Sequence, residues 1–348
     1  MAERVLVPAY VTGASARCSL GLSALQVAMC VRARKGEPRT TRFTDKRQRF
    51  IGVARTPGMR EDLHGFERMV ALAAPALRSV VPDGAALHPV PLVLAVPEAG
   101  RPDDDPRFGG AMLGVLAEQA GFRLDGARSR TLRAGHAGVA LALALALDEL
   151  TRGATLVIVG GVDSYYHPEV LAWLDAECRL HALDAENGFL PGEGAGFLAL
   201  ARQDPARGRS DATAQGRATA QAVVRGVEVG REETVLHDAP NTAQTMTRLI
   251  AALAASTPER KIPWVLTDLN GERHRGREWA MVAARGALAE GAVHDRFAGE
   301  LGDLGAATGG VLGAVTCALF SAGAAPAGSA CIALSSDGPE RGAFLLGT

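Results

Sequence analysis

The stretch RAGHAGVALALALALDELTRGATLVIVGGVDS, residues 133–164, decides the fold class of this chain. Residues 138–150 are apolar on every helical face until Asp148, which predicts a helix that is buried on all sides. Gly153 follows at a position typical of a helix C-cap, and residues 154–159 then form an apolar run of strand length. Because a helix of this kind belongs in the middle of a core, the stretch predicts a layered α/β protein.

Short apolar runs of strand length recur along the whole chain and alternate with helical stretches. This alternation favours an α/β fold with sheets covered on both faces. The polar residues 202–217, punctuated by Gly and Pro, predict a linker or surface loop between two halves. The predicted strands are residues 5–11, 91–96, 154–159, 196–201, 222–227, 263–266, 330–334 and 343–346.

The composition limits which binding partners and which cellular compartment we expect. The 348 residues include 37 Lys and Arg against 38 Asp and Glu, so neither nucleic acid nor an anionic membrane is predicted as a partner. The five cysteines show no metal-binding spacing and predict reduced thiols in a cytoplasmic protein, and we expect neither a metal nor a cofactor. Residues 304–334 carry no charge, but glycines interrupt them, so they predict a buried helix, a loop and a strand rather than a membrane span.

Several motifs, in this order, resemble a β-ketoacyl-ACP synthase of the thiolase superfamily. The first half carries VTGASARCSLGLSA (11–24), the buried helix with its glycine-rich start, VIVGGVDSYYHPEVLAWL (157–174) and GFLPGEGAGFLALA (188–201). The second half continues more faintly with TDLNGE (267–272), GDLGAATGGVLGA (302–314) and SSDGPERGAFLL (335–346). The resemblance implies a thiolase-like five-layer αβαβα fold from two similar halves, residues 1–205 and 206–348. It also implies a homodimer across the first-half sheet, with residues 162–173 in the contact.

The resemblance implies where catalytic groups would stand. A condensing enzyme of this family uses a Cys at the start of the buried helix as its nucleophile, and two His side chains stabilise the oxyanion. At the nucleophile position this chain carries Gly135 or, with a shift of one residue, His136, and both assignments stay open. Asn270 meets the first His position and Asp303 meets the second. Since all three positions depart from the family, we predict that the protein has no condensing activity.

Five residues are therefore the candidate site. His136, Asn270 and Asp303 are candidate catalytic residues, and Gly135 and Glu272 are candidate substrate-binding residues. A histidine at the start of a buried helix would be held neutral by the helix dipole and by burial, and it could act as a base. The alternative is a core histidine whose hydrogen bonds are satisfied.

Other polar residues have simpler interpretations. Glu193 is predicted to be structural, with its carboxylate bound to backbone amides. The charged run 272–278 predicts a solvated helix start, with a place at the mouth of a pocket as the alternative. Residues 163–167 follow a strand end, where α/β folds often place ligands, although the resemblance puts them at the dimer contact. The cysteines are predicted to be small buried hydrophobic residues: Cys18, Cys30, Cys178, Cys317 and Cys331.

Three functions stay open at this point. The first is a non-condensing pseudoenzyme that binds an acyl group, an acyl carrier protein or a condensing synthase partner, as chain-length-factor subunits of the family do. The second is an active acyltransferase with a site rebuilt around His136. The third is a non-enzymatic scaffold or adaptor, for example in a secretion system. Gly, Asn and Asp at the catalytic positions favour the first and third, because a rebuilt site usually shows a new nucleophile.

Overall fold

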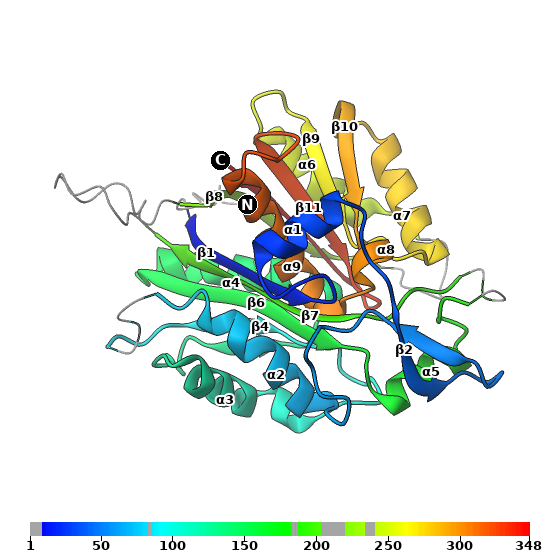
Figure 1. Ribbon diagram of the computed structural model, residues 1–348. Coiled ribbons are helices and arrows are strands. Elements are labelled where there is room, and N and C mark those ends of the chain that lie inside the picture. The colour runs from blue at the N-terminus through cyan, green and yellow to red at the C-terminus, as the bar shows by residue number, and fades with distance from the viewer. Residues whose placement is uncertain are drawn as a thin grey trace.

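A large mixed sheet forms the frame of the protein. The computed structural model describes residues 9–82, 85, 87–182, 185, 187–202, 220–233 and 241–348. In these residues ten strands run in the order β10-β9-β11-β12-β8-β1-β7-β6-β4-β5 (Figure 1). The strands are β1 (Ala9–Cys18), β4 (Leu92–Ala95), β5 (Arg130–Leu132), β6 (Leu156–Ser164), β7 (Glu193–Ala201), β8 (Ala222–Arg231), β9 (Ile262–Thr267), β10 (Leu288–Arg296), β11 (Ser329–Ser335) and β12 (Glu340–Gly347).

The strand order repeats between the two halves of the chain. Outward from the centre, β1-β7-β6-β4-β5 of the first half matches β8-β12-β11-β9-β10 of the second. In both series the second and third strands are antiparallel, and the third, fourth and fifth are mutually parallel. The predicted two-half thiolase-like architecture is therefore confirmed. The domain boundary at 205/206 lies outside the described residues and stays a prediction.

Helices cover both faces of each half-sheet. They are α1 (Ala24–Arg32), α2 (Gly65–Arg78), α3 (Gly110–Ala120), α4 (Gly138–Thr151), α5 (Pro168–Ala176), α6 (Gln244–Ala255), α7 (Arg273–Ala284), α8 (Ala298–Leu301) and α9 (Thr308–Ser321), with 3-10 turns η1 (Pro106–Phe108), η2 (Gly135–Ala137) and η3 (Gly305–Ala307). Helices α2 and α3 lie outside the first half-sheet, α6 and α7 lie on the second, and α4 and α9 lie between the two (Figure 1).

The two central helices explain why the layers stack. Both are 14 residues long, and their apolar side chains form one core with residues from both half-sheets. Strands β1 and β8 pair at only three positions, Ala9↔Val224 to Val11↔Ala222, so the sheet can turn over at this seam and enclose α4 and α9. Most of their apolar side chains are buried, which stabilises them here. Helix α4 nevertheless has one partly exposed face with Leu141, Leu145 and Asp148, so the prediction that it is buried on all sides holds only in part.

The sequence prediction of the secondary structure is largely confirmed. The buried helix at 138–150 is α4, and the uncharged run at 304–334 forms η3, α9 and β11. No helix in the described part of the chain is long and apolar enough to cross a membrane. The predicted linker at 202–217 lies almost wholly outside the described residues.

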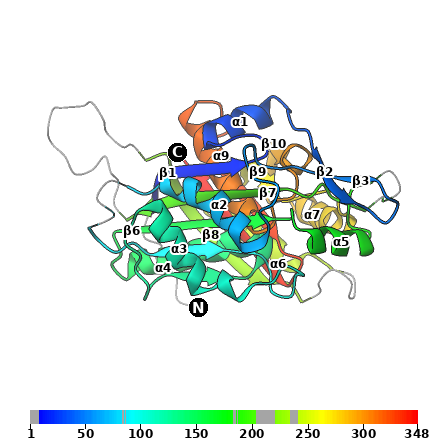
Figure 2. The ribbon, with the colours of Figure 1, turned by 60° about the horizontal axis from the view of Figure 1, so that its bottom comes forward.

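A small separate sheet lies beside this frame. Strands β2 (Arg39–Thr44) and β3 (Phe50–Val53), which the sequence did not predict, form an antiparallel hairpin. Ile51 and Val53 of β3 pack against Val170, Leu171 and Leu174 of α5. Figures 1 and 2 both draw the hairpin beside α5 at the periphery of the molecule.

Candidate functional site

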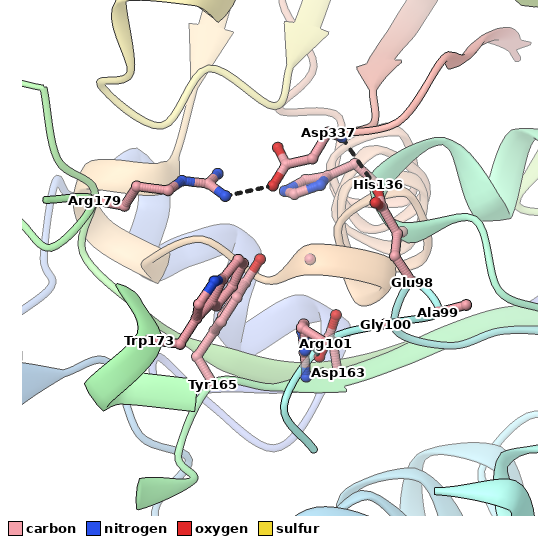
Figure 3. A pocket seen from close by; sticks show the side chains of 12 residues that line it. Glu98, Ala99, Gly100, Arg101, His136, Asp163, Tyr165, Trp173, Arg179 and Asp337 are labelled. Carbon is pink, nitrogen blue, oxygen red and sulfur yellow. Dashed lines mark hydrogen bonds and ion pairs between the residues drawn. The ribbon is translucent and has the colours of Figure 1, made fainter. Parts of the chain in front are cut away.

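A cavity of about 130 Å³ lies at the start of α4 (Figure 3). It brings together segments from the loop after β4, the end of β6, α5 and the turn between β11 and β12. Its lining residues are Glu98, Ala99, Gly100, Arg101, Gly135, His136, Asp163, Tyr165, Trp173, Arg179, Gly305 and Asp337. Of the five residues predicted from sequence, only Gly135 and His136 line this cavity.

The Glu98 carboxylate fills the space that a side chain at Gly135 would need. Gly135 has φ +55°, in the left-handed region, and a Cβ built on it would overlap the carboxylate of Glu98. Gly305 occupies the matching position before α9, has φ +50°, and its Cβ would overlap the carboxylate of Asp163. A carboxylate therefore stands over the start of each central helix, where a nucleophile's side chain would otherwise project.

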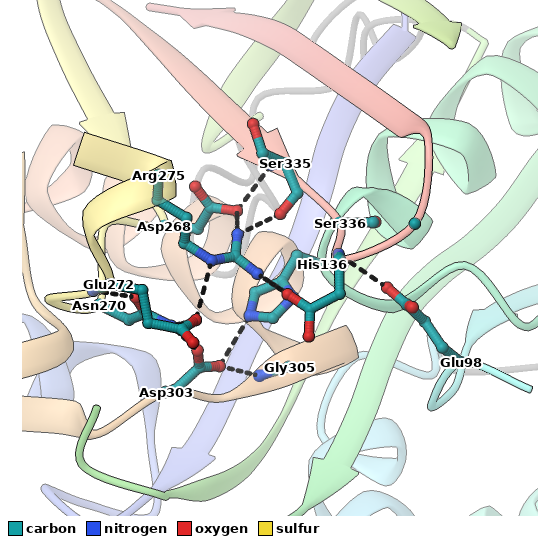
Figure 4. A network of polar contacts seen from close by, with 12 residues as sticks. Glu98, His136, Asp268, Asn270, Glu272, Arg275, Asp303, Gly305, Ser335 and Ser336 are labelled. Carbon is teal, nitrogen blue, oxygen red and sulfur yellow. Dashed lines mark hydrogen bonds and ion pairs between the residues drawn. The ribbon is translucent and has the colours of Figure 1, made fainter. Parts of the chain in front are cut away.

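The three predicted catalytic residues meet in one network (Figure 4). His136 Nε2 lies 2.7 Å from Asp303 Oδ1, and Asn270 Nδ2 donates to Asp303 Oδ2 at 2.6 Å. Asp303 also accepts the Gly305 N–H at 2.7 Å. The side chains of His136 and Asp303 are only 4% and 2% exposed, so this contact is screened very little by water.

Arg275 holds the network from the other side. It donates to Asp268 at 2.9 Å and Asp337 at 2.7 Å, and its NH2 group lies 3.3 Å from His136 Nδ1. Because a guanidinium can only donate, Nδ1 accepts, and the proton of the neutral imidazole resides on Nε2, facing Asp303. Both ring nitrogens of His136 therefore have partners.

The charges around His136 and Asp303 shift the pKa values of these two groups in opposite directions. Burial and the positive charge of Arg275 oppose the charged imidazolium, but the charge and hydrogen bond of Asp303 outweigh them and raise the pKa of His136. Burial alone would raise the pKa of Asp303, yet His136 and Arg275 hold it well below its usual range. Burial and the helix dipole alone would keep His136 neutral, but its pairing with Asp303 reverses the direction of the pKa shift.

Glu272 forms part of the same buried network. Its carboxylate receives two bonds from Arg179, at 2.6 and 2.9 Å, and one from Asn270 at 3.0 Å. Glu272, Arg275 and Glu278 are each at most 3% exposed, so the prediction of a solvated helix start for residues 272–278 is wrong for these three. These three residues form buried ion pairs instead. Glu272 pairs with Arg179, Arg275 pairs with Asp268, and Glu278 pairs with Arg341 at 2.7 Å.

Glu98 is one of the lining residues that the sequence analysis missed. One of its carboxylate oxygens accepts the backbone N–H of Asp337 at 3.1 Å, and the side chain faces the cavity (Figure 3). Burial and the neighbouring Asp337 carboxylate raise the pKa of Glu98. Its place after the buried strand β4 was a usable signal, because ligands of α/β folds gather at the carboxyl ends of strands. Asp337 carried the same signal, because it follows the buried strand β11, whereas Arg179 follows helix α5 and carried none.

The turn after β6 combines structural and cavity roles. Asp163 pairs with Arg101 at 2.9 Å and accepts the Ala306 N–H at 2.9 Å, while Tyr165 lines the cavity. Both side chains are buried within a single chain, so neither needs a dimer partner to cover it. Glu193 accepts the Thr56 N–H at 2.9 Å and pairs with Arg68 at 2.8 Å, in keeping with its predicted structural role.

No residue that lines this cavity is a Cys, Ser or Thr. Cys18, Cys317 and Cys331 are buried, and burial raises the pKa of each thiol to about 12, so all three are poor nucleophiles near neutral pH. Cys178 is exposed and Cys30 is partly exposed, which corrects the prediction that every cysteine is buried.

One group of side chains has the composition of a metal site. Donor atoms of Glu272, His274 and Asp337 lie within 4.8 Å of one another. Arg179 pairs with both carboxylates, at 2.6 and 2.7 Å, so their charges are already balanced by a guanidinium that a metal ion would have to displace. This donor set does not fit a metal ion well.

Comparison with known proteins agrees with the fold described above. Residues 103–206 match the sequence model of the N-terminal domain of β-ketoacyl synthases. The ketosynthase from module 6 of the bacillaene synthase of Bacillus subtilis 168 superposes with a TM-score of 0.75 at 11% identity, covering 98% of this chain and 72% of that one. The chain therefore has a thiolase-like fold of the ketosynthase type, and residues 103–206 resemble the N-terminal domain of β-ketoacyl synthases.

Two further structures resemble this β-ketoacyl synthase-like chain over nearly their full length. The ishigamide ketosynthase/chain length factor superposes with a TM-score of 0.69 at 20% identity, covering 97% of this chain and 98% of that one. AntDE:AntF, a type II polyketide synthase acyl carrier protein in complex with its ketosynthase bound to the hexaketide, superposes with a TM-score of 0.75 at 13% identity, covering 98% and 99%. No curated protein sequence matches the chain.

Proposed function

We propose that this protein is a non-condensing β-ketoacyl synthase homologue that binds a short acyl group in the cavity at the start of α4. The observation that carries the proposal is Gly135, whose side-chain space is filled by Glu98. No Cys, Ser or Thr lines the cavity, and burial raises the pKa of the one phenol there, that of Tyr165, well above its usual range, so an acyl group has no effective nucleophile to attach to.

The size of the cavity limits the ligand. An engineered cavity of about 150 Å³ holds benzene, so about 130 Å³ accommodates a group of about six non-hydrogen atoms. The wall carries Trp173 and Tyr165 beside Arg101 and Arg179, which suits a short acyl group with a polar end. In this role Gly135 leaves room for the Glu98 carboxylate beside the ligand, and Glu272 holds Arg179 in place.

The alternative of a rebuilt acyltransferase around His136 has less support. Its ring nitrogens are held by Asp303 and Arg275, and its side chain is 4% exposed, so it has no nitrogen available for a substrate. Within the proposal, His136, Asn270 and Asp303 form an internal brace for the start of α4. A pure scaffold would need no cavity with convergent polar groups, which favours ligand binding over that third function.

Partners and compartment are part of the same proposal. The acyl group would arrive on an acyl carrier protein, and the protein would act as a homodimer or beside a condensing synthase. Similarity to a ketosynthase/chain length factor and to a ketosynthase bound to its carrier protein supports these partners. The five free cysteines support a reducing, cytoplasmic compartment.

The test separates binding from covalent chemistry. Acetyl- and malonyl-pantetheine are titrated into the full chain by calorimetry, and intact mass is then measured after incubation with acetyl- and malonyl-CoA. Ala99→Trp, at an exposed lining position, should abolish binding because its indole fills the cavity, whereas Ala127→Trp, at an exposed position elsewhere, should not change it.

Each outcome decides one part of the proposal. Binding that Ala99→Trp removes, with no mass adduct, supports a non-condensing binder. A stoichiometric acyl adduct on any residue overturns the non-condensing assignment. No heat of binding at millimolar ligand, or equal binding by the Ala99→Trp variant, overturns the assignment of the cavity.

A further inference from the structure

The two arginines on the wall of the cavity at the start of α4 are already neutralised by carboxylates. Each guanidinium contacts two carboxylates at 2.6–2.9 Å: Arg101 contacts Asp103 and Asp163, and Arg179 contacts Glu272 and Asp337. An anionic ligand would have to compete with these buried ion pairs for either arginine. Neither arginine therefore offers a ready binding site for an anion.

Glu98 differs from the other carboxylates of the wall because, within the described residues, no cation pairs with it. Asp163 and Asp337 each pair with an arginine, whereas Glu98 accepts the backbone N–H of Asp337 at 3.1 Å. Burial and the Asp337 charge raise the pKa of Glu98, so its negative charge is unfavourable in the empty cavity. A positively charged ligand would supply the missing partner for this carboxylate.

The charges around the cavity leave an excess of negative charge. The charged lining residues of the described chain, together with the groups that pair directly with them, comprise six carboxylates and at most four cations. The carboxylates are those of Glu98, Asp103, Asp163, Glu272, Asp303 and Asp337, and the cations are Arg101, Arg179, Arg275 and His136. This excess attracts a cation and repels an anion, even with His136 protonated.

The rest of the wall suits an ammonium group better than a metal ion. Trp173 and Tyr165 present aromatic rings, whose faces attract cations, and Figure 3 draws both side chains across the cavity from Glu98. An ammonium group can contact a carboxylate and an aromatic face at the same time. A divalent metal ion prefers several oxygen ligands, and Glu98 is the one lining carboxylate that no arginine already holds.

We propose that the short acyl group bound in this cavity carries a positively charged amino group, which pairs with Glu98 beside Trp173 and Tyr165. This inference rests on the proposed function and names the class of its ligand, an aminoacyl group rather than an acyl group with a carboxylate end. Glycyl and β-alanyl groups belong to this class, and both are within the size of about six non-hydrogen atoms that the cavity accommodates.

The test compares probes of similar size that differ in charge. In each probe, aminopantetheine carries the acyl group through an amide that replaces the reactive thioester. The glycyl probe ends in an ammonium group, the propionyl probe in a methyl group and the malonyl probe in a carboxylate. Each is titrated into the full chain by calorimetry at pH 7. We expect the glycyl probe to bind at least about tenfold more tightly than the propionyl probe, because hydrogen bonds between charged groups are the strong ones, and the malonyl probe to bind most weakly.

Glu98→Gln separates the charge of this side chain from its shape. The amide has nearly the same size as the carboxylate but carries no negative charge. The preference for the glycyl over the propionyl probe should therefore fall to less than about twofold, while the affinity for the propionyl probe stays nearly constant. Glu118→Gln, which removes an exposed carboxylate from α3, is the matched control and should leave both affinities unchanged.

The outcomes distinguish this inference from the function on which it rests. Propionyl binding as tight as glycyl binding, with both abolished by Ala99→Trp, overturns the ammonium assignment and leaves acyl binding in the cavity intact. A full glycyl preference in Glu98→Gln overturns the assignment of the partner. Displacement of the glycyl probe by millimolar magnesium chloride, but not by sodium chloride of equal ionic strength, overturns the choice of an ammonium group over a metal ion. Failure of all three probes to bind overturns the proposed function, and this inference with it.

Discussion

The starts of α4 and α9 are equivalent positions in the two halves, yet their carboxylates are held very differently. Asp163, over Gly305, pairs with Arg101 and bonds to the Ala306 N–H, and it is 1% exposed. Glu98, over Gly135, is partly exposed, bonds to one backbone N–H and faces the cavity. Both carboxylates line the cavity, but Asp163 also joins layers of the fold, whereas Glu98 is only lightly held beside it.

The largest expected difference is in stability. Asp163→Ala leaves the buried Arg101 with only Asp103 as an acidic partner and leaves the Ala306 N–H unsatisfied, so we expect a loss of about 3–5 kcal/mol. Glu98→Ala should cost less than about 1 kcal/mol, since its carboxylate makes one hydrogen bond at a partly exposed site. Urea denaturation followed by circular dichroism measures both. Equal losses would remove the distinction between the two carboxylates.

The glycines below these carboxylates provide the next comparison. Gly305→Ala places a Cβ against a fixed carboxylate at φ +50°, and we expect a cost of about 2–3 kcal/mol. Gly135→Ala meets a carboxylate that can turn toward solvent, so its cost should be limited to the backbone strain of about 1–2 kcal/mol. Both variants are compared by urea midpoint. A larger loss at Gly135 would show that Glu98 is as rigid as Asp163.

A third prediction concerns the lost nucleophile. In Gly135→Cys the thiol competes with Glu98 for one space, whereas Glu98→Gly/Gly135→Cys opens that space to the cavity. The helix start favours a thiolate there, so the double variant should react with iodoacetamide at least about tenfold faster than the single one. Intact mass over time gives both rates, with Glu98→Gly alone as the control for native cysteines. Equal rates would show that Glu98 does not fill the nucleophile space.

The fold could be predicted because its signals are local. The all-apolar helix α4, the strand runs and the glycine turns are each contained in short windows, and they recur in each half in the same order. The hairpin β2–β3 was missed because its strands are short and largely exposed, with Arg39 and Arg42 where a buried strand would carry Val or Ile. Its stability comes from packing on α5, which no local pattern shows.

The site could be predicted only in part, for the same physical reason. His136, Asn270 and Asp303 were found because they occupy aligned positions of a known family, and the structure brings them together. Glu98, Arg179 and Asp337 reach the cavity through loops whose meeting depends on the whole fold. Their roles depend on burial and on ion pairs between residues distant in sequence, as in the 2.7 Å contact of Arg179 with Asp337.

The smallest predicted effect is in the pH dependence of stability. Burial and Asp337 raise the pKa of Glu98, so the folded state holds this proton more tightly than the unfolded chain. The stabilisation from this proton is complete below the unfolded pKa of Glu and is lost as pH rises through the folded value. Glu98→Gln cannot lose the proton, and at pH 7 it should be more stable than wild type by less than about 1 kcal/mol, because Glu98 is partly exposed.

At pH 4 the same two proteins should have nearly equal stability, because Glu98 is then largely protonated in both states. Urea midpoints at pH 4, 5.5 and 7 give the comparison, and Glu118→Gln on the exposed face of α3 serves as the control for removing a surface carboxylate. A Glu98→Gln variant that is less stable than wild type at pH 7 would mean that the ionised carboxylate is favoured in the folded state. Glu98 would then be held in the folded protein as an ionised carboxylate, as Asp163 is by Arg101. The starts of α4 and α9 would be equivalent in chemistry as well as in position.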